Sequence, residues 1–487
     1  MSRITMKKII IVAIFTLFSW PYMTSLAEIE LPEIGDSAGS IVSPYQEYRI
    51  GQSFYWRLQQ SVDLIDDPEI TDYLSELGER LVANSDAPQL SFKFFMVPDN
   101  RVNAFAAPGG FIGVNSGLLL TSHEEDELAS VLAHEIAHVT QRHLIRSFER
   151  QKQLSLPTTA AMIGALLLGA ADPEMGAAAI TAVQAGGVQA QLNFTRANER
   201  EADNMGMLTL VRSGFNAHAM PTFFERLQQA NQFHTGRSIP EFLRSHPVTS
   251  SRIADSRGRA NTYPLKRQPS DRQKFYLIRE KLRVMTTPNL TQLIQYYAGS
   301  LEVGSNVNST ATKYGYSLAL AAIGNYSQAK AILRELIDND GERLTYQLAL
   351  ADMELSRGHI KTALAIYEQN QRLYPRDYAL TIKQVIALLQ AKQPEVSTEK
   401  LLNQYQLGRQ TQKVYKLLAQ AYGDMDNNSQ AHSWLAEYYY SAGRLKQSVD
   451  QLKLAIKFAR GDKFQLAKLN SRLHEVETQL KELDEPL

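Results

Sequence analysis

Hydrophobic residues recur every three or four positions over most of the chain, which is the pattern of helices with one buried face. Between residues 51 and 262 this pattern is interrupted by one short strand region, Phe111–Asn115, after a predicted turn at Pro108-Gly109-Gly110. Residues 28–50 contain Pro and Ser with little periodicity, and we expect them to wrap a surface. The segment 28–262 is therefore predicted to be an α+β domain that is predominantly helical.

Two further helical patterns, at 274–285 and 290–301, are separated by the helix-breaking sequence Thr286-Thr287-Pro288. They predict a helical connector at 263–309, which a second break at Gly304-Ser305 would end. From residue 310 to about 480 the chain is almost entirely helical, so an all-α domain is expected there. The length of 487 residues exceeds what one hydrophobic core usually supports, in agreement with more than one domain.

The all-α domain repeats with a period of 34 residues. Gly324 and Gly358 each precede a small residue by five positions, and the period continues through Ala329, Ala363, Ser397 and Ala431. Four residues after each small residue there is a larger side chain: Leu333, Tyr367, Leu401 and Leu435. Small residues let two helices cross closely, so the period predicts a tetratricopeptide-repeat solenoid at 310–480. A non-repeating helical bundle is the alternative. Lys392 and Asp426 stand where the turn glycine is missing, so we expect the middle repeats to be degenerate.

The first 27 residues have the pattern of a secretory signal peptide. Three basic residues come before or at the start of an apolar run at 9–20, and Ser25-Leu26-Ala27 offers small residues at the cleavage spacing. The apolar run is shorter than the roughly 20 residues that a membrane span requires. We therefore expect cleavage after Ala27 and a location in the bacterial periplasm, with an uncleaved membrane anchor as the alternative.

The composition excludes several classes of protein. The chain has 51 Lys and Arg against 51 Asp and Glu, so it lacks the overall basic charge of many nucleic-acid-binding proteins. It has no cysteine, which excludes a disulfide scaffold, an iron–sulfur cluster, a thiolate zinc finger and a cysteine nucleophile. A metal site in this chain must use histidine and carboxylate side chains.

The candidate chemistry is centred on His134-Glu135-Ile136-Ala137-His138. Ser122 and Glu125 predict a capping box at the start of the helix that carries it. His134 and His138 are one helical turn apart on one face, which suits two ligands of a tetrahedral zinc ion. Glu135 is placed to act as general base towards an attacking water. The alternative is a helix with two surface histidines, which the apolar surroundings disfavour because buried imidazoles need partners.

A third ligand is expected from a second helix-like run at about 195–213. Glu199 and Asp203 are spaced i, i+4 and therefore share a face, so one can bind the metal while the other accepts a hydrogen bond from a ligand histidine. We predict Glu199 as the ligand and Asp203 as the orienting residue, with one Zn²⁺ per chain. Glu201 lies about 200° around the helix from Glu199 and is not expected on that face. A solvated, charged helix face is the alternative.

The arrangement His134-Glu135-x-x-His138 followed by Glu199-x-x-x-Asp203 resembles the HtpX-like gluzincin metallopeptidases. The likeness is greatest to the periplasmic members that carry C-terminal tetratricopeptide repeats, and it covers nearly the whole mature chain, including residues 103–118 and His246-Pro247 with Arg252. It implies a zincin-type domain and a zinc endopeptidase with chaperone-like activity that hydrolyses stalled or misassembled outer-membrane proteins and promotes their assembly. The implied partners are the outer-membrane β-barrel assembly machinery and unfolded clients.

Several elements of this resemblance have a physical interpretation. An exposed strand edge beside the metal, assigned here to Phe111–Asn115, could pair with an extended substrate, although an ordinary buried strand is the alternative. Asn103 could donate to a substrate carbonyl or serve in a turn. The resemblance places His246 and Arg252 near the active site, to assist or gate it. His246 could fill the position reserved for water in a latent enzyme, stabilise the oxyanion of the intermediate, or cap a helix.

Three further questions concern one apolar segment and the overall function. The small-residue segment 157–190 is either a pair of packed helices or a mobile apolar flap that contacts membrane or substrate. The competing function is a non-proteolytic chaperone or adaptor of the β-barrel assembly machinery with a latent zinc site. A membrane-embedded prenyl-protein peptidase is disfavoured because no second apolar span follows the signal segment.

Overall fold

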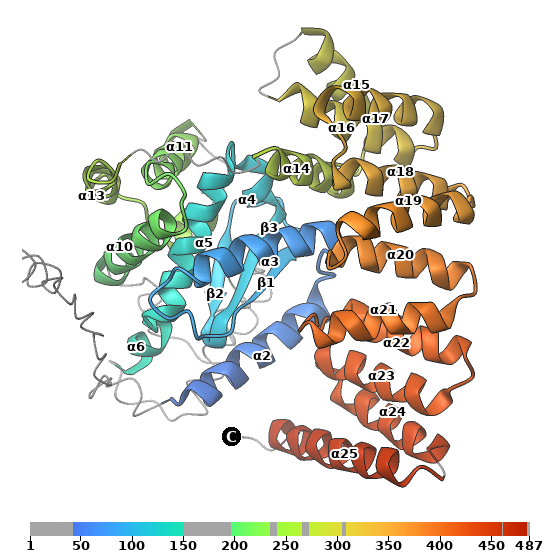
Figure 1. Ribbon diagram of the computed structural model, residues 1–487. Coiled ribbons are helices and arrows are strands. Elements are labelled where there is room, and N and C mark those ends of the chain that lie inside the picture. The colour runs from blue at the N-terminus through green and yellow to red at the C-terminus, as the bar shows by residue number, and fades with distance from the viewer. Residues whose placement is uncertain are drawn as a thin grey trace, which may run out of the picture.

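The computed structural model describes residues 42–149, 196–233, 241–264, 272–303, 308–459 and 461–484. The predicted signal peptide, its cleavage site, the segment 157–190 and Gly304-Ser305 lie outside the described residues. Figure 1 shows a helical domain with a small sheet, and an array of helical pairs that curves around it. This confirms the predicted class, a predominantly helical α+β domain followed by an all-α solenoid. None of the described helices is both long and apolar enough to span a membrane.

In its described residues, the first domain consists of helices around three strands. Its elements are α2 (Pro44–Ser61), α3 (Pro68–Val82), β1 (Lys93–Val97), β2 (Ala104–Ala107), β3 (Phe111–Asn115), α4 (Ser116–Thr121), α5 (Glu125–Thr140), α6 (His143–Glu149), α10 (Arg196–Arg212), α11 (Ala219–Phe233), α12 (Glu241–Ser245) and α13 (Ser250–Ala260). Helix α2 begins inside the stretch 28–50, for which little regular structure was expected. The reason is a capping box between Ser43 and Gln46, with Pro44 at the first helical position.

The sheet has the order β1-β3-β2. Strand β3 pairs in parallel with β1, with Phe95 opposite Gly113, and antiparallel with β2, with Phe105 opposite the same glycine. The turn between β2 and β3 is tight because Gly109 and Gly110 both take positive φ angles, 71° and 86°. The expected edge strand is wrong: β3 lies in the middle of the sheet, and the edge beside α5 belongs to β2.

The motif helix α5 starts differently from the prediction. Ser122 does not cap it; the Ser122 hydroxyl donates to the carbonyl of Leu118 and terminates α4. Helix α5 begins at Glu125 without a side-chain cap, and its first turn is acidic, which the positive end of the helix dipole favours. The apolar face of α5 lies in the core, with Leu128, Val131, Leu132 and Ile136 buried and Val139 half-buried.

The second part of the chain is a run of helices, α14 to α25. Their bounds are α14 (Arg272–Thr286), α15 (Leu290–Val303), α16 (Ser309–Ala322), α17 (Tyr326–Asp340), α18 (Leu344–Ser356), α19 (Ile360–Leu373), α20 (Tyr378–Gln390), α21 (Pro394–Gln406), α22 (Gln412–Asp424), α23 (Asn428–Ser441), α24 (Leu445–Phe458) and α25 (Lys463–Asp484). The small residues of the 34-residue period fall in α17, α19, α21 and α23; Ala329, Ala363 and Ser397 are fully buried. The turns at Gly324 and Gly358 have positive φ, and Lys392 and Asp426 adopt the same conformation with φ of 60° and 56°.

The array is anchored on the first domain in two places. At the N-terminus of α3, Glu69 pairs with Lys281 of α14 and, at 3.2 Å, with Lys383 of α20, and all three side chains are buried. Near the other end of the array, Trp56 of α2 packs edge-on against Tyr440 of α23, with ring centroids 5.7 Å apart. Helix α14 contributes to the cores of both parts and so connects the array to the domain that carries the motif.

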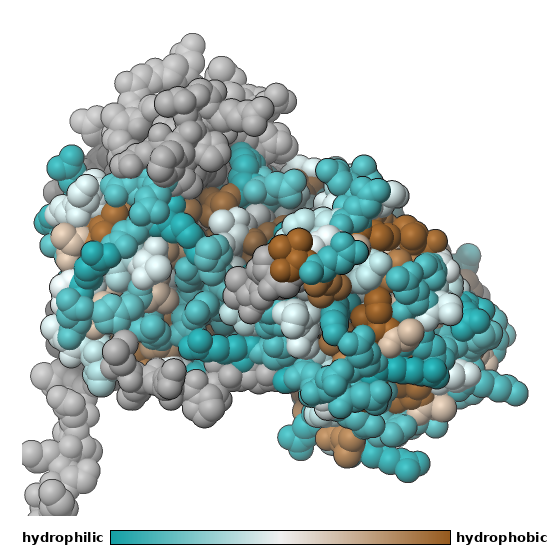
Figure 2. All heavy atoms as spheres, turned by 90° about the horizontal axis from the view of Figure 1, so that it is seen from above, coloured by the Kyte–Doolittle hydropathy of each residue, from teal (hydrophilic) through white to brown (hydrophobic). Residues whose placement is uncertain are grey.

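Among the described residues, most of the exposed large hydrophobic side chains lie on the array. In the view from above, hydrophilic residues cover most of the visible face, and hydrophobic residues are grouped at the end that carries α15 and α16 (Figure 2). Met285, Tyr296, Val303 and Ile323 are among the exposed large hydrophobic residues of this end. This apolar surface therefore belongs to the array and not to the elements that carry the motif residues.

Candidate metal centre

The candidate site forms where α10 crosses α5. A Cβ atom on Gly206 of α10 would lie 3.0 Å from the Cα and the backbone N of His134, which is closer than ordinary side-chain contact. The neighbouring Ala202 is also small and fully buried. These two residues let the helix backbones approach closely, and the approach brings Glu199 and Asp203 against the motif histidines.

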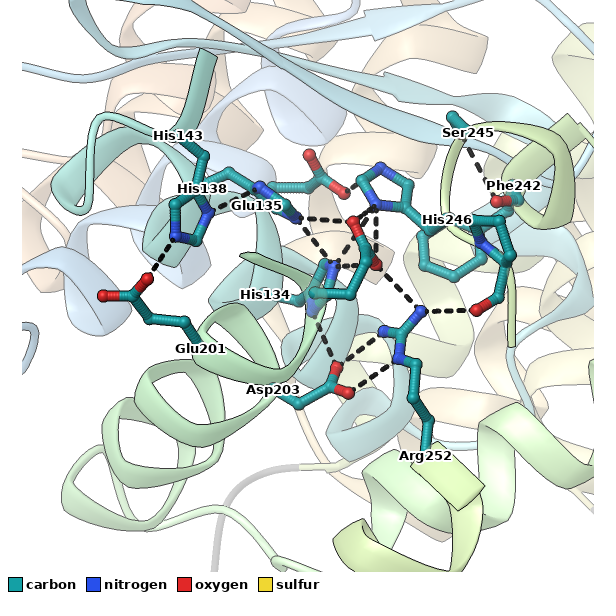
Figure 3. Close-up of polar contacts among 12 residues, drawn as sticks. His134, Glu135, His138, His143, Glu201, Asp203, Phe242, Ser245, His246 and Arg252 are labelled. Atoms are coloured by element: carbon teal, nitrogen blue, oxygen red, sulfur yellow. Dashed lines mark hydrogen bonds and ion pairs between the residues drawn. The ribbon is translucent and has the colours of Figure 1, made fainter. Parts of the chain in front are cut away.

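Four side chains from three segments converge at this crossing (Figure 3). Donor atoms of His134, His138, Glu199 and His246 all lie within 4.8 Å of one another, and all four residues are buried. The Nε2 atoms of His134 and His138 are 3.0 Å apart. Glu199 places its two carboxylate oxygens 3.6 Å and 3.5 Å from these nitrogens, and Nδ1 of His246 lies 3.1 Å from Oε1 of Glu199.

These spacings fit a metal ion. A tetrahedral ion with bonds of about 2.0–2.1 Å holds its ligand atoms about 3.3–3.4 Å apart. The donor set is two or three imidazole nitrogens and one carboxylate, which are ligands of zinc and of other divalent transition metals. Two imidazole nitrogens that face each other at 3.0 Å need a shared proton or a shared cation between them. The residues present therefore match the group that the motif implies.

Glu135 lies beside the cluster on the side of the sheet. It is 1 % exposed and its Oε1 makes no hydrogen bond, although Nε2 of His246 is 3.4 Å away. Burial raises the pKa of the Glu135 carboxyl, and the positive charge of nearby histidines and the backbone N–H of Ala106 in β2 partly oppose this shift. A carboxyl with a raised pKa can both take and return a proton near neutral pH, as a general base requires.

Asp203 connects the cluster to a buried arginine. Its Oδ1 lies 3.0 Å from Nδ1 of His134, on the side of the ring opposite to the metal-facing Nε2. Arg252 of α13 donates two hydrogen bonds to Asp203, at 2.8 and 2.7 Å, and a further N–H lies 2.8 Å from Oε2 of Glu199. The guanidinium thus lies between the two carboxylates and also donates to the carbonyl of Pro247, next to His246.

The protonation equilibria of the cluster follow from burial and these contacts. Burial opposes a charge on His134, but the carboxylates of Asp203 and Glu199 outweigh it and raise the pKa of His134 to about 9. Burial and the neighbouring His134 hold the pKa of His138 well below its usual range. Burial alone would raise the pKa values of Glu199 and Asp203, but His246 and Arg252 respectively, with His134, lower both. Glu199 and Asp203 are therefore ionised and His138 is neutral, whereas His134 holds a proton that it must release to bind a metal.

Sequence reasoning missed one residue of this environment, His143. Its Nδ1 lies 2.9 Å from Nδ1 of His138, and its Nε2 lies 3.1 Å from a carboxylate oxygen of Glu201. Glu201 is absent from the metal-facing cluster, in agreement with its predicted direction, but it reaches the site through His143. The signal available in the sequence was a third histidine five positions after His138, whose contact depends on the bend between α5 and α6.

Asn103 is buried just before β2, with its backbone carbonyl bonded to the N–H of Asn115, and it is not part of the cluster. The adjacent Val102 carbonyl accepts from the backbone N–H of Phe242. This bond attaches α12, and with it His246, to the chain that enters the edge strand. The loop histidine is therefore held against the sheet as well as against Glu199.

Comparisons with known proteins agree with this site. Residues 68–260 match the model of peptidase family M48. The chain is 35% identical over 457 residues to the beta-barrel assembly-enhancing protease of Escherichia coli (strain K12), covering 93% of this chain and 92% of that one. It is 39% identical over 338 residues to a putative beta-barrel assembly-enhancing protease of Vibrio cholerae, covering 68% and 69%.

A more distant relative shares only part of the chain. The mitochondrial metalloendopeptidase OMA1 of Schizosaccharomyces pombe is 31% identical over 201 residues, which cover 41% of this chain and 56% of that protein. The similarity to the Escherichia coli protease extends through the helical array as well as the peptidase domain, because it covers 93% of this chain and 92% of that protein. The chain is a metalloendopeptidase and belongs to the family of the beta-barrel assembly-enhancing proteases.

Proposed function

We propose that the metal of this peptidase is Zn²⁺, held by His134, His138 and Glu199, with Glu135 as general base. The observation that carries the proposal is the buried convergence of these ligand atoms within 4.8 Å, next to a carboxyl that has an oxygen without a hydrogen bond. When bound, zinc supplies Lewis acidity towards the scissile carbonyl and lowers the pKa of the attacking water. The reaction is hydrolysis of a peptide bond.

The protein groups divide the remaining work. Glu135 takes a proton from the attacking water and returns it to the leaving amine, since its buried carboxyl favours the protonated form more than a solvated one does. Oδ1 of Asp203 lies 3.0 Å from Nδ1 of His134, where its negative charge favours a hydrogen on that nitrogen and leaves Nε2 available as a ligand. Arg252 holds Asp203 and Glu199 in place and compensates their negative charge. Asp203 and Arg252 are positioning residues.

His246 is proposed to keep the resting enzyme latent. Its Nδ1 lies 3.1 Å from Glu199 and 3.4 Å from Nε2 of His134, so its ring lies where a fourth ligand would lie. A catalytic metal needs that position open for water or substrate. Catalysis then requires α12 and the following loop to move away from the cluster.

The strand edge that would take a substrate is β2. Among the described residues, β2 pairs only with β3, and Ala106 of β2 faces Glu135. An extended peptide that pairs with β2 by main-chain hydrogen bonds would run past the cluster, and such pairing accepts many sequences. We propose this strand, in place of the predicted β3, as the substrate-pairing edge.

The relatives' names connect their activity with the assembly of β-barrels. We propose the same setting for this chain: the periplasm, with stalled outer-membrane proteins as clients and the β-barrel assembly machinery as partner. The helical array, with its exposed apolar residues at α15 and α16, supplies a surface for such contacts. The closed state of His246 also favours a second function, a chaperone or adaptor that works without cleavage.

A Glu135→Gln variant distinguishes the two functions. We expect it to bind one zinc per chain and to keep its fold, while cleavage of an unfolded outer-membrane protein falls by several orders of magnitude. Glu124→Gln, at the exposed start of the same helix, is the matched control and should cleave normally. Continued cleavage by Glu135→Gln would reject the catalytic assignment, and purified wild-type protein without stoichiometric zinc would reject the choice of metal.

A further inference from the structure

A carboxylate–histidine pair, Glu201 and His143, lies behind His138 on the side away from the metal-facing cluster. We propose that His143 and Glu201 are positioning residues that orient His138 as a metal ligand, just as Asp203 orients His134. This inference rests on the proposed metal site and adds two residues to it. Glu201 lies outside the group of ligand atoms, and the sequence motif does not include His143.

The contacts form an unbroken chain from α10 to the cluster (Figure 3). Nε2 of His138 faces His134 and Glu199, while its Nδ1 lies 2.9 Å from Nδ1 of His143. The other nitrogen of His143, Nε2, lies 3.1 Å from Oε2 of Glu201. His143 is fully buried, so no water competes for either ring nitrogen.

The chemistry of Glu201, His143 and His138 determines which nitrogen of each imidazole carries a hydrogen. An ionised carboxylate only accepts, so the Nε2 of a neutral His143 carries the hydrogen that points to Glu201. Nδ1 of His143 is then an acceptor, and the hydrogen between the two rings belongs to Nδ1 of His138. With Nδ1 protonated, His138 must present a lone pair at Nε2, which is the tautomer that binds metal. Glu201 thus selects the tautomer of His138 through one intervening ring.

The two motif histidines therefore have different supports for the same purpose. Asp203 is on the metal-facing side of α10 and reaches Nδ1 of His134 directly at 3.0 Å. Glu201 lies on a different side of the same helix, and the imidazole of His143 connects it to His138. His143 is buried because it fills the space between His138 and Glu201.

The backbone between α5 and α6 is shaped to place His143. Arg142, which precedes it, has a φ of 52°, a left-handed conformation that is unfavourable for a non-glycine residue. Its side chain is held by Glu47, with Nε at 2.7 Å, and by the carbonyl of Val42 at 2.8 Å. This conformation turns the chain back at the end of α5, so that His143 faces the motif. Arg146, one turn later, lies 3.2 Å from Glu201 and fixes the far end.

The test measures metal affinity, with Zn²⁺ in competition with a chromophoric chelator as the probe. In the full chain, His143→Leu removes the acceptor but keeps the volume, and it should weaken zinc binding by about 10–100-fold. His143→Asn keeps an acceptor near the Nδ1 position and should recover most of that loss. The absorption bands of Co²⁺ bound in place of zinc should shift in the Leu variant and return in the Asn variant. Arg200→Gln, adjacent to Glu201 on α10 but paired with Asp255, is the control and should bind zinc normally.

Glu201→Gln tests the other partner of His143. Because the Glu201 side chain is partly exposed, this substitution leaves the buried packing intact. It should weaken zinc binding severalfold, and combined with His143→Leu it should add nothing, because Glu201 acts only through His143. An unchanged zinc affinity in Glu201→Gln and His143→Leu, or equal losses in the Leu and Asn variants, would overturn the inference. Wild-type protein that binds no metal would instead overturn the proposed function.

Discussion

The buried guanidinium of Arg252 compensates the negative charges of Asp203 and Glu199, and its contribution to the free energy of unfolding can be measured. Arg252 is 4 % exposed and makes three close contacts with the carboxylates of Asp203 and Glu199, each of which is 2 % exposed. Arg252→Met keeps the length of the side chain but removes the charge. Two buried carboxylates then lose their shared cation, and removing one member of a buried ion pair costs about 3–5 kcal/mol in the free energy of unfolding.

The assay is chemical unfolding of the full chain in the presence of a chelator, so that no metal compensates the carboxylates. The control is Arg257→Met on the same helix, because the side chain of Arg257 is 59% exposed and pairs with Glu225. An exposed ion pair contributes about 0–1 kcal/mol, so the two methionine variants should differ severalfold in their cost. Arg252→Lys should fall between them, because an ammonium cannot form the paired hydrogen bonds to Asp203.

The reasoning would be refuted if Arg252→Met were no more destabilising than Arg257→Met. Equal losses would mean that Asp203 and Glu199 are protonated, or are solvated, when the arginine is absent. The pKa values of both carboxyls are lowered by their contacts, chiefly with Arg252 and His246, so the structure predicts that both are ionised at neutral pH.

Three further predictions concern two helices near the site and one turn of the array. Burial raises the pKa of Asp72 to about 6 against the attraction of Arg409, so this group favours folding below its unfolded pKa of about 3.9 and that contribution is lost as pH rises through about 6. Asp72→Asn should therefore raise the thermal stability of the chain relative to wild type at pH 7 but not at pH 4. If thermal unfolding showed that the variant is less stable than wild type at pH 7, the ion pair with Arg409 would outweigh the cost of burial. Gly206→Val should cost about 1–3 kcal/mol and lower the zinc content, because the side chain would push α10 and its carboxylates off His134; unchanged zinc content by atomic absorption would contradict the close crossing. Lys392→Gly should stabilise the array by about 0.5–1 kcal/mol in urea unfolding, since it removes a strained positive φ, whereas glycine inside helix α21 should destabilise it; losses in both variants would show that Lys392 is not strained.

Local patterns predicted what depends on local geometry. A spacing of four residues puts two side chains on one face of any helix, so the pairs His134 with His138 and Glu199 with Asp203 could be recognised before the fold was known. The 34-residue period likewise identified the helical pairs, since each repeat packs mainly against its neighbours. Lys392 and Asp426 show that the turns persist without glycine, so the repeats are less degenerate in structure than in sequence.

Predictions failed where a residue could serve either of two neighbouring elements. Ser122 has the spacing of a helix cap, yet its hydroxyl closes the preceding helix α4. Phe111–Asn115 is a strand, but its position in the sheet depends on pairing with β1 and β2, which strand patterns do not specify. Residues 44–50 lack a clear period because α2 buries side chains against both the first domain and the array.

The chain's own order of residues determined which groups can do chemistry: two imidazoles and a carboxylate at helical spacing, a second acidic pair downstream, and no thiol anywhere. Only the tertiary structure decided that α10 crosses α5 at Gly206 and that β2 is an outer strand of the described sheet. It also decided that His246 joins the cluster and that His143 connects Glu201 to His138. The physical reason is that helical and strand periods follow from the backbone within a few residues. Contacts between segments depend instead on how closely whole elements can pack, and that is decided jointly by residues far apart in the chain.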